Sequence, residues 1–335
     1  MVGEDPLLRE AVFSAAAALQ LHPRAVDVAA LAGGWRGASA VFLGADVAQA
    51  VADLGLPRRP GVYLAGGDAA ELGRWSMPLG AEVIPLPEGR AWLSSVLARG
   101  SDGQAPVVTV VGGSGGVGAS TLAALLACRA ARRGRAVVLV DLDPYGGGLD
   151  LLMGAEQAMG WRWPRLAGAA GYLGDLSGQL PQVEGVSVLS MARGFTPDVT
   201  REPLAAVVAS LQRSFELVLI DPGRAALVNV RESLRLATSV LLLVGTTLRS
   251  VAAARQLADA LELSDARLVV RDQPGGSVPA AAVAESIALP KGLRLPEDAA
   301  LRAAAENGDP PGYRSRAGCL RTADRILEAA TGWGR

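Results

Sequence analysis

Residues 112–121 read Gly-Gly-Ser-Gly-Gly-Val-Gly-Ala-Ser-Thr and have the outline of a phosphate-binding loop. Such a loop follows the pattern G-x-x-x-x-G-K-[ST]: backbone N–H groups surround the phosphates, the lysine reaches their oxygens and the hydroxyl holds Mg²⁺. Gly113 and Gly118 have this spacing and Ser120 supplies the hydroxyl, but Ala119 takes the place of the lysine. This glycine loop therefore predicts a nucleotide site that lacks its main cationic side chain.

The sequence on either side of the glycine loop has the pattern of a strand followed by a helix. Residues 106–111 are a β-branched run typical of a buried strand. Residues 120–133 carry leucine, alanine and arginine at helical spacing, and Gly134 suits a helix C-terminus. This is the context that a phosphate-binding loop requires. The alternative is a glycine-rich turn of an unrelated α/β protein, but five glycines exceed the needs of a tight turn.

Two hydrophobic runs further along the chain end in aspartates, the first in Asp141 and Asp143 and the second in Asp221. In phosphate-binding-loop proteins, a carboxylate at such a strand end holds Mg²⁺ directly or through water. We therefore predict Ser120, Asp141 and Asp221 as metal ligands. The alternative for each carboxylate is a helix cap or a turn.

These motifs together resemble the deviant-Walker-A group of proteins that includes MinD, ParA and CpaE/TadZ. The loop of that group reads K-G-G-x-G-K-[ST]-[ST], so Ser114 stands for the early lysine and Ala119 for the late one. The resemblance implies that Asp143 belongs to a switch segment associated with the attacking water, and that Asp221 ends the Walker B strand. The nucleotide-binding residues that it implies are Gly113, Ser114, Gly115, Gly116, Val117, Gly118, Ala119, Ser120 and Thr121.

Within this group, the chain is similar to the CpaE-like septum site-determining (Ssd) proteins of actinobacteria. The similarity lies in residues 140–152, in the Trp-Arg-Trp-Pro run at 161–164 and in short segments between 268 and 298. It implies a cytoplasmic regulator of septum-site selection and cell division that uses ATP or ADP with Mg²⁺, is recruited to the septum or pole, and binds division-septum proteins or a second copy of itself. The alternatives are a localisation factor for pilus or secretion proteins, and a genuine ATPase.

The two missing lysines affect how such a site works. A hydrogen bond to a charged group contributes roughly 1.5–3 kcal/mol, so its loss predicts nucleotide binding about ten- to a hundredfold weaker. Hydrolysis should suffer more, because charge stabilisation of the transferring phosphoryl group is most of what such enzymes supply. We therefore predict a degenerate ATPase, unless an arginine such as Arg224 replaces the lysine; a surface or salt-bridged Arg224 is the alternative. In the family the early lysine reaches across a nucleotide-bound dimer, a contact that Ser114 is unable to make.

The chain is predicted to contain two α/β domains. Residues 99–106 are a small, polar, proline-ended linker between a domain at 1–98 and a phosphate-binding-loop domain at 107–335. In the second domain, helices separate six predicted hydrophobic strands, which lie near residues 107–111, 136–141, 186–190, 216–221, 238–244 and 267–271. This pattern predicts a doubly wound, mostly parallel sheet. Right-handed crossovers then place the glycine loop, Asp143 and Asp221 along one edge of that sheet.

The first domain resembles the receiver-like domain that precedes the ATPase-like domain in CpaE-type proteins. A working receiver needs an acceptor aspartate at a strand end and a lysine before a proline. Gly44 and Leu86 occupy these positions, with Asp46 two residues beyond the first. We therefore predict a pseudo-receiver used for docking or dimerisation; a plain structural cap is the alternative.

Composition excludes several other classes of protein. Half of the 335 residues are hydrophobic, enough for a sizeable core, and a net charge of −1 gives no electrostatic signal for nucleic acid. The arginines at 129–135 indicate either a solvated helix end or a local basic patch. The two cysteines lack metal-binding spacing, and no apolar run is long enough to span a bilayer. Helical spacing at 320–330 predicts a packed helix, whereas Trp161 and Trp163 suit either a partner contact or the core.

Overall fold

The computed structural model describes residues 1–333, except 20, 36–37, 39, 58, 60, 100–104, 172, 195–198 and 225. The chain divides into two compact units, Met1–Gln104 with Ala170–Leu173, and Ala105–Ala169 with Gly174–Arg335. Both units are α/β and their sheets are mostly parallel, which confirms the predicted fold class. Most of the predicted linker at 99–106 lies outside the described residues.

The N-terminal unit is a three-stranded parallel sheet with helices on both faces. The strands, in spatial order, are β1 (Val41–Leu43), β2 (Val62–Gly66) and β3 (Glu82–Pro85), and the helices are α1 (Pro6–Ala18), α2 (Val28–Gly34), α3 (Ala45–Asp53), α4 (Ala69–Leu79) and α5 (Arg90–Arg99). Side chains of β1 alternate between faces, as the strand period requires. Val41 and Leu43 join the core under α2, α3 and α4, whereas Phe42 joins the core under α1 and α5.

The acidic side chains near the end of β1 are engaged by the backbone. Gly44 follows this strand and is the N-cap of α3, so no carboxylate stands at the predicted acceptor position. The Asp46 carboxylate accepts a hydrogen bond from the Glu4 N–H at 2.7 Å. Asp5 accepts one from the Leu7 N–H at 2.8 Å and caps α1. Both carboxylates therefore support the local chain, as N-terminal capping side chains do.

The C-terminal unit contains an eight-stranded sheet. From one edge to the other its strands are β11 (Leu293–Leu295), β10 (Arg267–Arg271), β9 (Ser239–Gly245), β4 (Val107–Gly112), β8 (Leu217–Asp221), β5 (Val137–Asp141), β7 (Val186–Leu189) and β6 (Gln182–Val183). All six strands predicted in this domain are present, whereas β6 and β11 were not predicted. The pairing of β6 with β7 is antiparallel and the other pairs are parallel.

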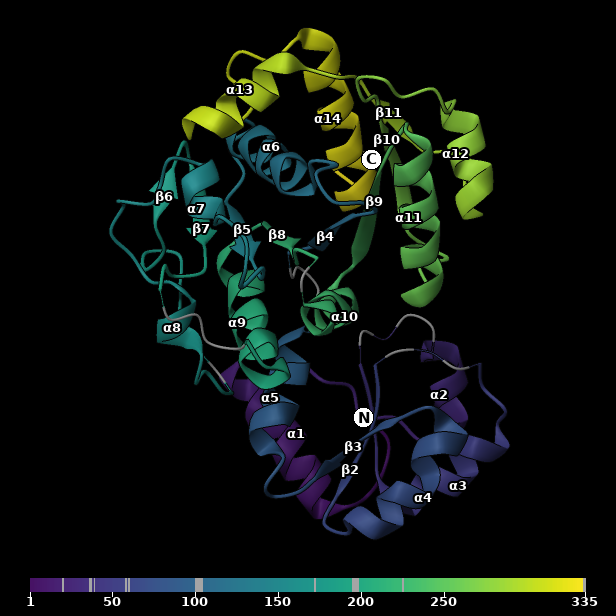
Figure 1. The fold of residues 1–335 in the computed structure, drawn as a ribbon. Coiled ribbons are helices and arrows are strands. Elements are labelled where there is room, and N and C mark those ends of the chain that lie inside the picture. Colours follow the sequence, from purple (N-terminus) through teal and green to yellow (C-terminus); the bar gives the residue numbers. More distant parts are fainter. Residues whose placement is uncertain are drawn as a thin grey trace. The chain divides into compact units, whose positions relative to one another are not determined.

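Helices cover both faces of this sheet (Figure 1). They are α6 (Ala119–Arg132), α7 (Leu149–Leu152), α8 (Trp163–Leu166), α9 (Arg201–Ser214), α10 (Leu227–Leu236), α11 (Leu248–Ala260), α12 (Ala280–Ile287), α13 (Ala299–Asn307) and α14 (Ala317–Thr331). Val108 and Val110 of β4 pack with α6 and α14, whereas Val111 packs with α10, α11 and α12. Burial of both faces explains why the strands read as continuous hydrophobic runs instead of alternating ones.

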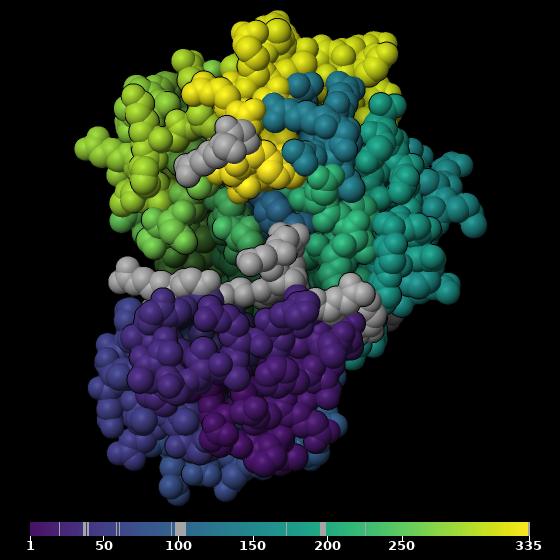
Figure 2. All heavy atoms as spheres, turned by 180° about the vertical axis from the view of Figure 1, so that it is seen from behind, coloured from purple at the N-terminus to yellow at the C-terminus, as the bar shows by residue number. Residues whose placement is uncertain are grey.

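The C-terminal helix α14 packs on α6, which confirms the packed helix that its spacing predicted. In Figure 2 the yellow C-terminal residues border blue residues of the C-terminal unit. Three arginines of the run at 129–135 are engaged in ion pairs within the unit. Arg129 pairs with Asp324 at 2.7 Å, Arg133 with Glu328 at 3.1 Å, and Arg135 with Glu216 at 2.7 Å. These pairs favour the helix-end interpretation of the run over a basic patch for nucleic acid.

Candidate nucleotide site

The candidate site lies at the carboxyl ends of parallel strands β4, β5, β8 and β10. The glycine loop leaves β4 and leads into α6, and the neighbouring strands end at Asp141, Asp221 and Arg271. A cavity of about 640 Å³ opens here, which we call the loop cavity. It is lined by residues 114–121 of the loop and also by Asp143, Asp221, Gly223, Arg224, Arg271, Gln273, Arg302 and Glu306. Ligands of open α/β sheets bind at this edge.

Two glycines of the loop are required by close contacts with neighbouring elements. The Gly113 N–H donates to the Leu243 carbonyl of β9 at 2.8 Å, and a Cβ at Gly113 would lie 2.5 Å from the Ala254 Cβ. Gly118 has a φ of 94°, which favours glycine, and a Cβ there would lie 2.6 Å from Arg271 Nη1. Gly113 was predicted as a nucleotide contact, but the cavity wall in the described part of the chain does not include it; its place is against β9 and α11.

The side chains at the two former lysine positions add no charge to the cavity. The Ser114 hydroxyl lies 2.7 Å from the Ser250 hydroxyl of α11, which in turn accepts the Gly245 N–H at 3.0 Å. Ala119 is the first residue of α6 and presents only a methyl group to the cavity. The loop therefore keeps backbone N–H groups and the helix N-terminus as its means of attracting an anion.

An arginine from another strand, which was not predicted as a site residue, holds the glycine loop in place. Arg271 ends β10, and its Nη1 donates to the Val117 carbonyl oxygen at 2.7 Å, while its Nη2 donates to Glu297 at 2.9 Å. Glu297 also pairs with Arg302. The signal in the sequence that points to it is a charged residue at the end of a hydrophobic strand.

Asp221 and Ser120 are brought together at the end of β8, as predicted. Burial raises the pKa of the Asp221 carboxyl, and hydrogen bonds from the Ser120 hydroxyl and the Gly223 N–H lower it. The Gly223 N–H lies 3.1 Å from Asp221 Oδ1. A hydroxyl and a carboxylate are hard oxygen ligands, which Mg²⁺ combines with substrate phosphates and water. These two residues therefore fit the metal that the resemblance implies.

Asp143 also lines the cavity, beside the turn that follows Asp221. Its carboxylate accepts the Tyr145 N–H at 3.0 Å. Gly223 has a φ of 63°, and a Cβ at that position would overlap the Asp143 side chain. The charge of Asp143 contributes to the raised pKa of Asp221. The structure thus brings the two predicted carboxylates to one cavity.

Asp141, predicted as a metal ligand, ends β5 beside the site, and the cavity wall, as far as the chain is described, does not include it. Its Oδ1 accepts the Asp143 N–H at 3.0 Å, and its Oδ2 accepts the Leu149 N–H at 2.9 Å. Burial raises its pKa to about 7, against the lowering effect of these hydrogen bonds. Asp141 therefore holds both ends of the segment 143–149.

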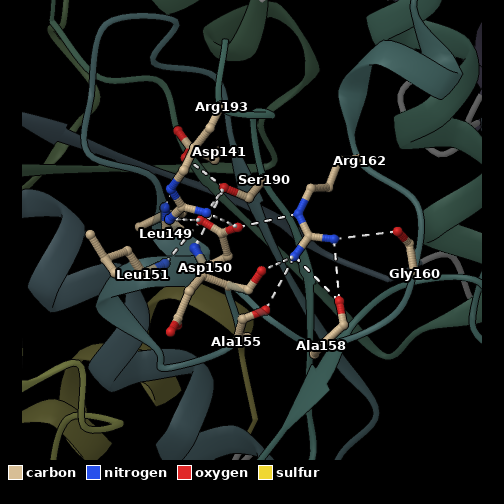
Figure 3. A network of polar contacts seen from close by, with 11 residues as sticks. Asp141, Leu149, Asp150, Leu151, Ala155, Ala158, Gly160, Arg162, Ser190 and Arg193 are labelled. Carbon is tan, nitrogen blue, oxygen red and sulfur yellow. Dashed lines mark hydrogen bonds and ion pairs between the residues drawn. The ribbon is translucent and has the colours of Figure 1, made fainter.

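Asp141 belongs to a buried polar network that also contains Ser190, Asp150 and Arg162 (Figure 3). The Ser190 hydroxyl lies 3.2 Å from carboxylate oxygens of both Asp141 and Asp150. Asp150 is 1% exposed and accepts from Arg162 Nε at 3.2 Å and Arg193 Nη2 at 3.4 Å. Arg162 also donates to the carbonyl oxygens of four loop residues, Ala155, Glu156, Ala158 and Gly160.

The Trp-Arg-Trp segment at 161–163 contributes to this polar network. Trp163 is fully buried and its Nε1 donates to the Asp141 carbonyl oxygen at 2.6 Å. Of the two interpretations of Trp163, core packing is therefore the one that the structure selects. Trp161 is partly exposed, with the Arg165 guanidinium 4.6 Å from its ring centroid.

Comparison with known families assigns both parts of the chain. Residues 2–107 match the family described as "Rv3660c-like, CheY-like N-terminal domain". Residues 108–311 match the family described as "CobQ/CobB/MinD/ParA nucleotide binding domain". The uncharacterized protein Rv3660c of Mycobacterium tuberculosis H37Rv is 36% identical over 270 residues, which cover 76% of this chain and 75% of that protein.

Solved structures show the same fold. A ParA family ATPase from Chlorobium tepidum superposes with a TM-score of 0.58 at 16% identity, covering 68% of this chain and 98% of the other. The septum site-determining protein MinD from Pyrococcus horikoshii, solved with Mg-ADP, superposes with a TM-score of 0.53 at 19% identity, covering 67% and 95%.

Within the described residues, no helix combines the length and the apolar character that crossing a membrane requires. The glycine loop, the strand-end aspartates and the matched residues lead to one assignment. The chain belongs to the CobQ/CobB/MinD/ParA family of nucleotide-binding domains and carries a CheY-like N-terminal domain.

Proposed function

We propose that this protein binds ATP or ADP with Mg²⁺ in the loop cavity and acts as a nucleotide-responsive regulator with little or no hydrolysis. The observation that carries this proposal is a loop that keeps its glycines and its hydroxyl residue Ser120 while Ser114 and Ala119 stand at the two lysine positions. Ser120 and Asp221 remain paired, and Asp143 lines the same cavity. Backbone N–H groups of residues 114–121 surround the phosphates, and Ser120 and Asp221 hold the metal.

Binding and hydrolysis depend differently on the lost lysine. The N–H groups of the loop and the N-terminus of α6 attract a phosphate without any cationic side chain. Hydrolysis additionally requires charge stabilisation of the transferring phosphoryl group, and neither Ser114 nor Ala119 supplies it. A site with these residues favours occupancy over turnover, so its output is a change of conformation or of partner.

We further propose that the regulated process is septum-site selection, as in the MinD proteins whose fold it shares. The CheY-like domain, which lacks a carboxylate at position 44, would then serve as a docking or dimerisation module for a division protein or a second copy. A localisation factor for pilus or secretion proteins is the second candidate. A fluorescent fusion separates them: accumulation at mid-cell together with altered cell length supports the first, and accumulation only at a pole, with normal division, supports the second.

The molecular proposal is tested by calorimetry of the purified chain with ATP and ADP, with and without Mg²⁺, together with steady-state phosphate release. We expect saturable binding that Mg²⁺ strengthens, and phosphate release close to the rate without protein. No binding of either nucleotide would refute the proposal. Turnover that Asp143→Ala abolishes would instead identify a genuine ATPase in which Asp143 positions the attacking water.

A further inference from the structure

An arginine side chain lies beside the glycine loop, and the loop has no cationic side chain of its own. Arg224 lines the loop cavity, and a methyl group placed on Gly115 would lie 3.6 Å from Arg224 Nη1. Gly115 is the neighbour of Ser114, which stands at the early lysine position. The guanidinium is therefore next to the part of the loop from which the early lysine is missing.

The other two arginines of the cavity already have hydrogen-bond or ion-pair partners within the protein. Arg271 is bound to the Val117 carbonyl oxygen and to Glu297, and Arg302 pairs with the same Glu297. These two arginines, one from β10 and one from α13, thus share one carboxylate. Arg224 is exposed and makes no ion pair or hydrogen bond with any residue that the structure describes. Of the arginines that line this cavity, Arg224 is therefore the one without a carboxylate partner among the described residues.

The turn that carries Arg224 is fixed by the site itself. Gly223 donates its N–H to Asp221 and adopts a φ of 63°, with the Asp143 side chain packed against it. The position of Arg224 is thereby tied to both carboxylates of the cavity. An arginine presents several N–H donors in a planar fork that matches the oxygens of a phosphate group.

We propose that Arg224 supplies, from the end of β8, the positive charge for the terminal phosphates of the bound nucleotide that the glycine loop has lost at positions 114 and 119. This inference rests on the proposed nucleotide function. The relocated charge serves nucleotide binding, and the phosphate-release measurement described above tests separately for a role in hydrolysis. The ligand is then a nucleoside di- or triphosphate, and the contribution of Arg224 increases with the number of phosphates.

The test compares dissociation constants of ATP, ADP and AMP with Mg²⁺ by calorimetry for wild type and five variants. Arg224→Gln should weaken ATP binding roughly tenfold to a hundredfold, the range for a charge-assisted hydrogen bond, and should affect AMP much less. Arg224→Lys should retain part of the affinity. Ala119→Lys in the Arg224→Gln background should restore it, because the charge returns to its usual position. Arg231→Gln, at an exposed position of α10 outside the cavity wall, is the matched control and should change nothing.

The outcomes separate this inference from the proposed function. If wild type binds ATP and the Arg224→Gln variant binds ATP equally well, Arg224 does not contact the terminal phosphates. The same conclusion follows if the variant loses as much affinity for AMP as for ATP. If wild type binds nothing while the single variant Ala119→Lys binds ATP, Arg224 does not replace the lysine. If neither binds any nucleotide, the proposed function fails and the inference fails with it. Thermal unfolding of each variant checks that the exposed substitution leaves the fold intact.

Discussion

The guanidinium of Arg271 and the carbonyl oxygen of Val117 are joined by a hydrogen bond of 2.7 Å that links the end of β10 to the glycine loop. The two residues are 154 positions apart in the sequence. Because Gly118 has no Cβ, the guanidinium can approach the loop at this point. A loop without its own lysine is thus held in shape by a side chain from another strand.

Substitution of Arg271 by Gln should loosen the loop. The expected loss is about 1 kcal/mol of binding free energy for Mg-ATP, the usual net value of one hydrogen bond, or roughly fivefold in affinity. Calorimetry measures it. Arg294→Gln is the control, because that side chain is 70% exposed and pairs only with Asp272 among the described residues. Wild-type affinity in the Arg271 variant would show that the loop keeps its shape without this contact.

Restoration of the lysine by Ala119→Lys should strengthen ATP binding. The new ammonium would extend from the first turn of α6 into the loop cavity, where Ala119 now presents a methyl group. A gain of about tenfold, or ~1.4 kcal/mol, is expected from a charge-assisted contact. Ala119→Met, which has similar length and no charge, is the matched control. If both variants bind like wild type, the loop is not oriented as a phosphate cradle.

A methyl group at Gly223 should displace Asp143 and strain the turn. The φ of 63° disfavours any other residue, and the new Cβ would overlap the Asp143 side chain. Gly223→Ala is expected to lower the free energy of unfolding in urea by about 1–3 kcal/mol. Gly147→Ala has open space around it and should be neutral or slightly stabilising. Equal stability of the two variants would contradict the proposed packing of Asp143 against Gly223.

The buried carboxylate of Asp150 should contribute far more to stability than its exposed partner. Asp150 is 1% exposed and Arg193 is 53% exposed. Asp150→Asn leaves Arg162, whose side chain is only 18% exposed, without its counter-charge, so a loss of about 3–5 kcal/mol is expected. Arg193→Gln removes only a partly solvated pair and should cost less than about 1 kcal/mol. Urea unfolding of both variants gives the comparison, and similar losses would show that the network is not organised around Asp150.

Stability should depend on pH through Asp141. Its pKa is raised to about 7 from an ordinary 3.8, so between these values the folded protein holds a proton that the unfolded chain has released. The stability contributed by protonated Asp141 is therefore fully present below pH 4 and is lost as the pH rises through 7. The free energy of unfolding of wild type relative to Asp141→Asn should decrease over that interval.

Asp324 provides a control of opposite sign for this pH effect. Its pKa is lowered, mainly by the hydrogen bond from Arg129. Wild type relative to Asp324→Asn should therefore lose stability as the pH falls toward the acid range. A flat difference between wild type and Asp141→Asn from pH 4 to 8 would contradict the raised pKa of Asp141.

The sequence by itself determined the class of fold and the edge at which the site lies. Hydrophobic runs of four to seven residues separated by helical patterns are sufficient to predict a parallel sheet covered on both faces. In such a sheet the carboxyl ends of the strands share one edge, so the glycine loop, Asp143 and Asp221 had to meet there. The antiparallel β6 and the short β11 escaped prediction because strands of two or three residues give almost no periodic signal.

Only the tertiary structure decided what each strand-end side chain does. Asp141 is the last residue of β5 and Asp143 lies two residues further on, yet the first belongs to a buried network and the second lines the cavity. The sequence gives no distance between Val117 and Arg271, or between Gly115 and Arg224, because these pairs meet through the crossovers of the fold. A local pattern fixes backbone conformation and burial, whereas the partner of a charged side chain depends on which strand ends lie next to each other.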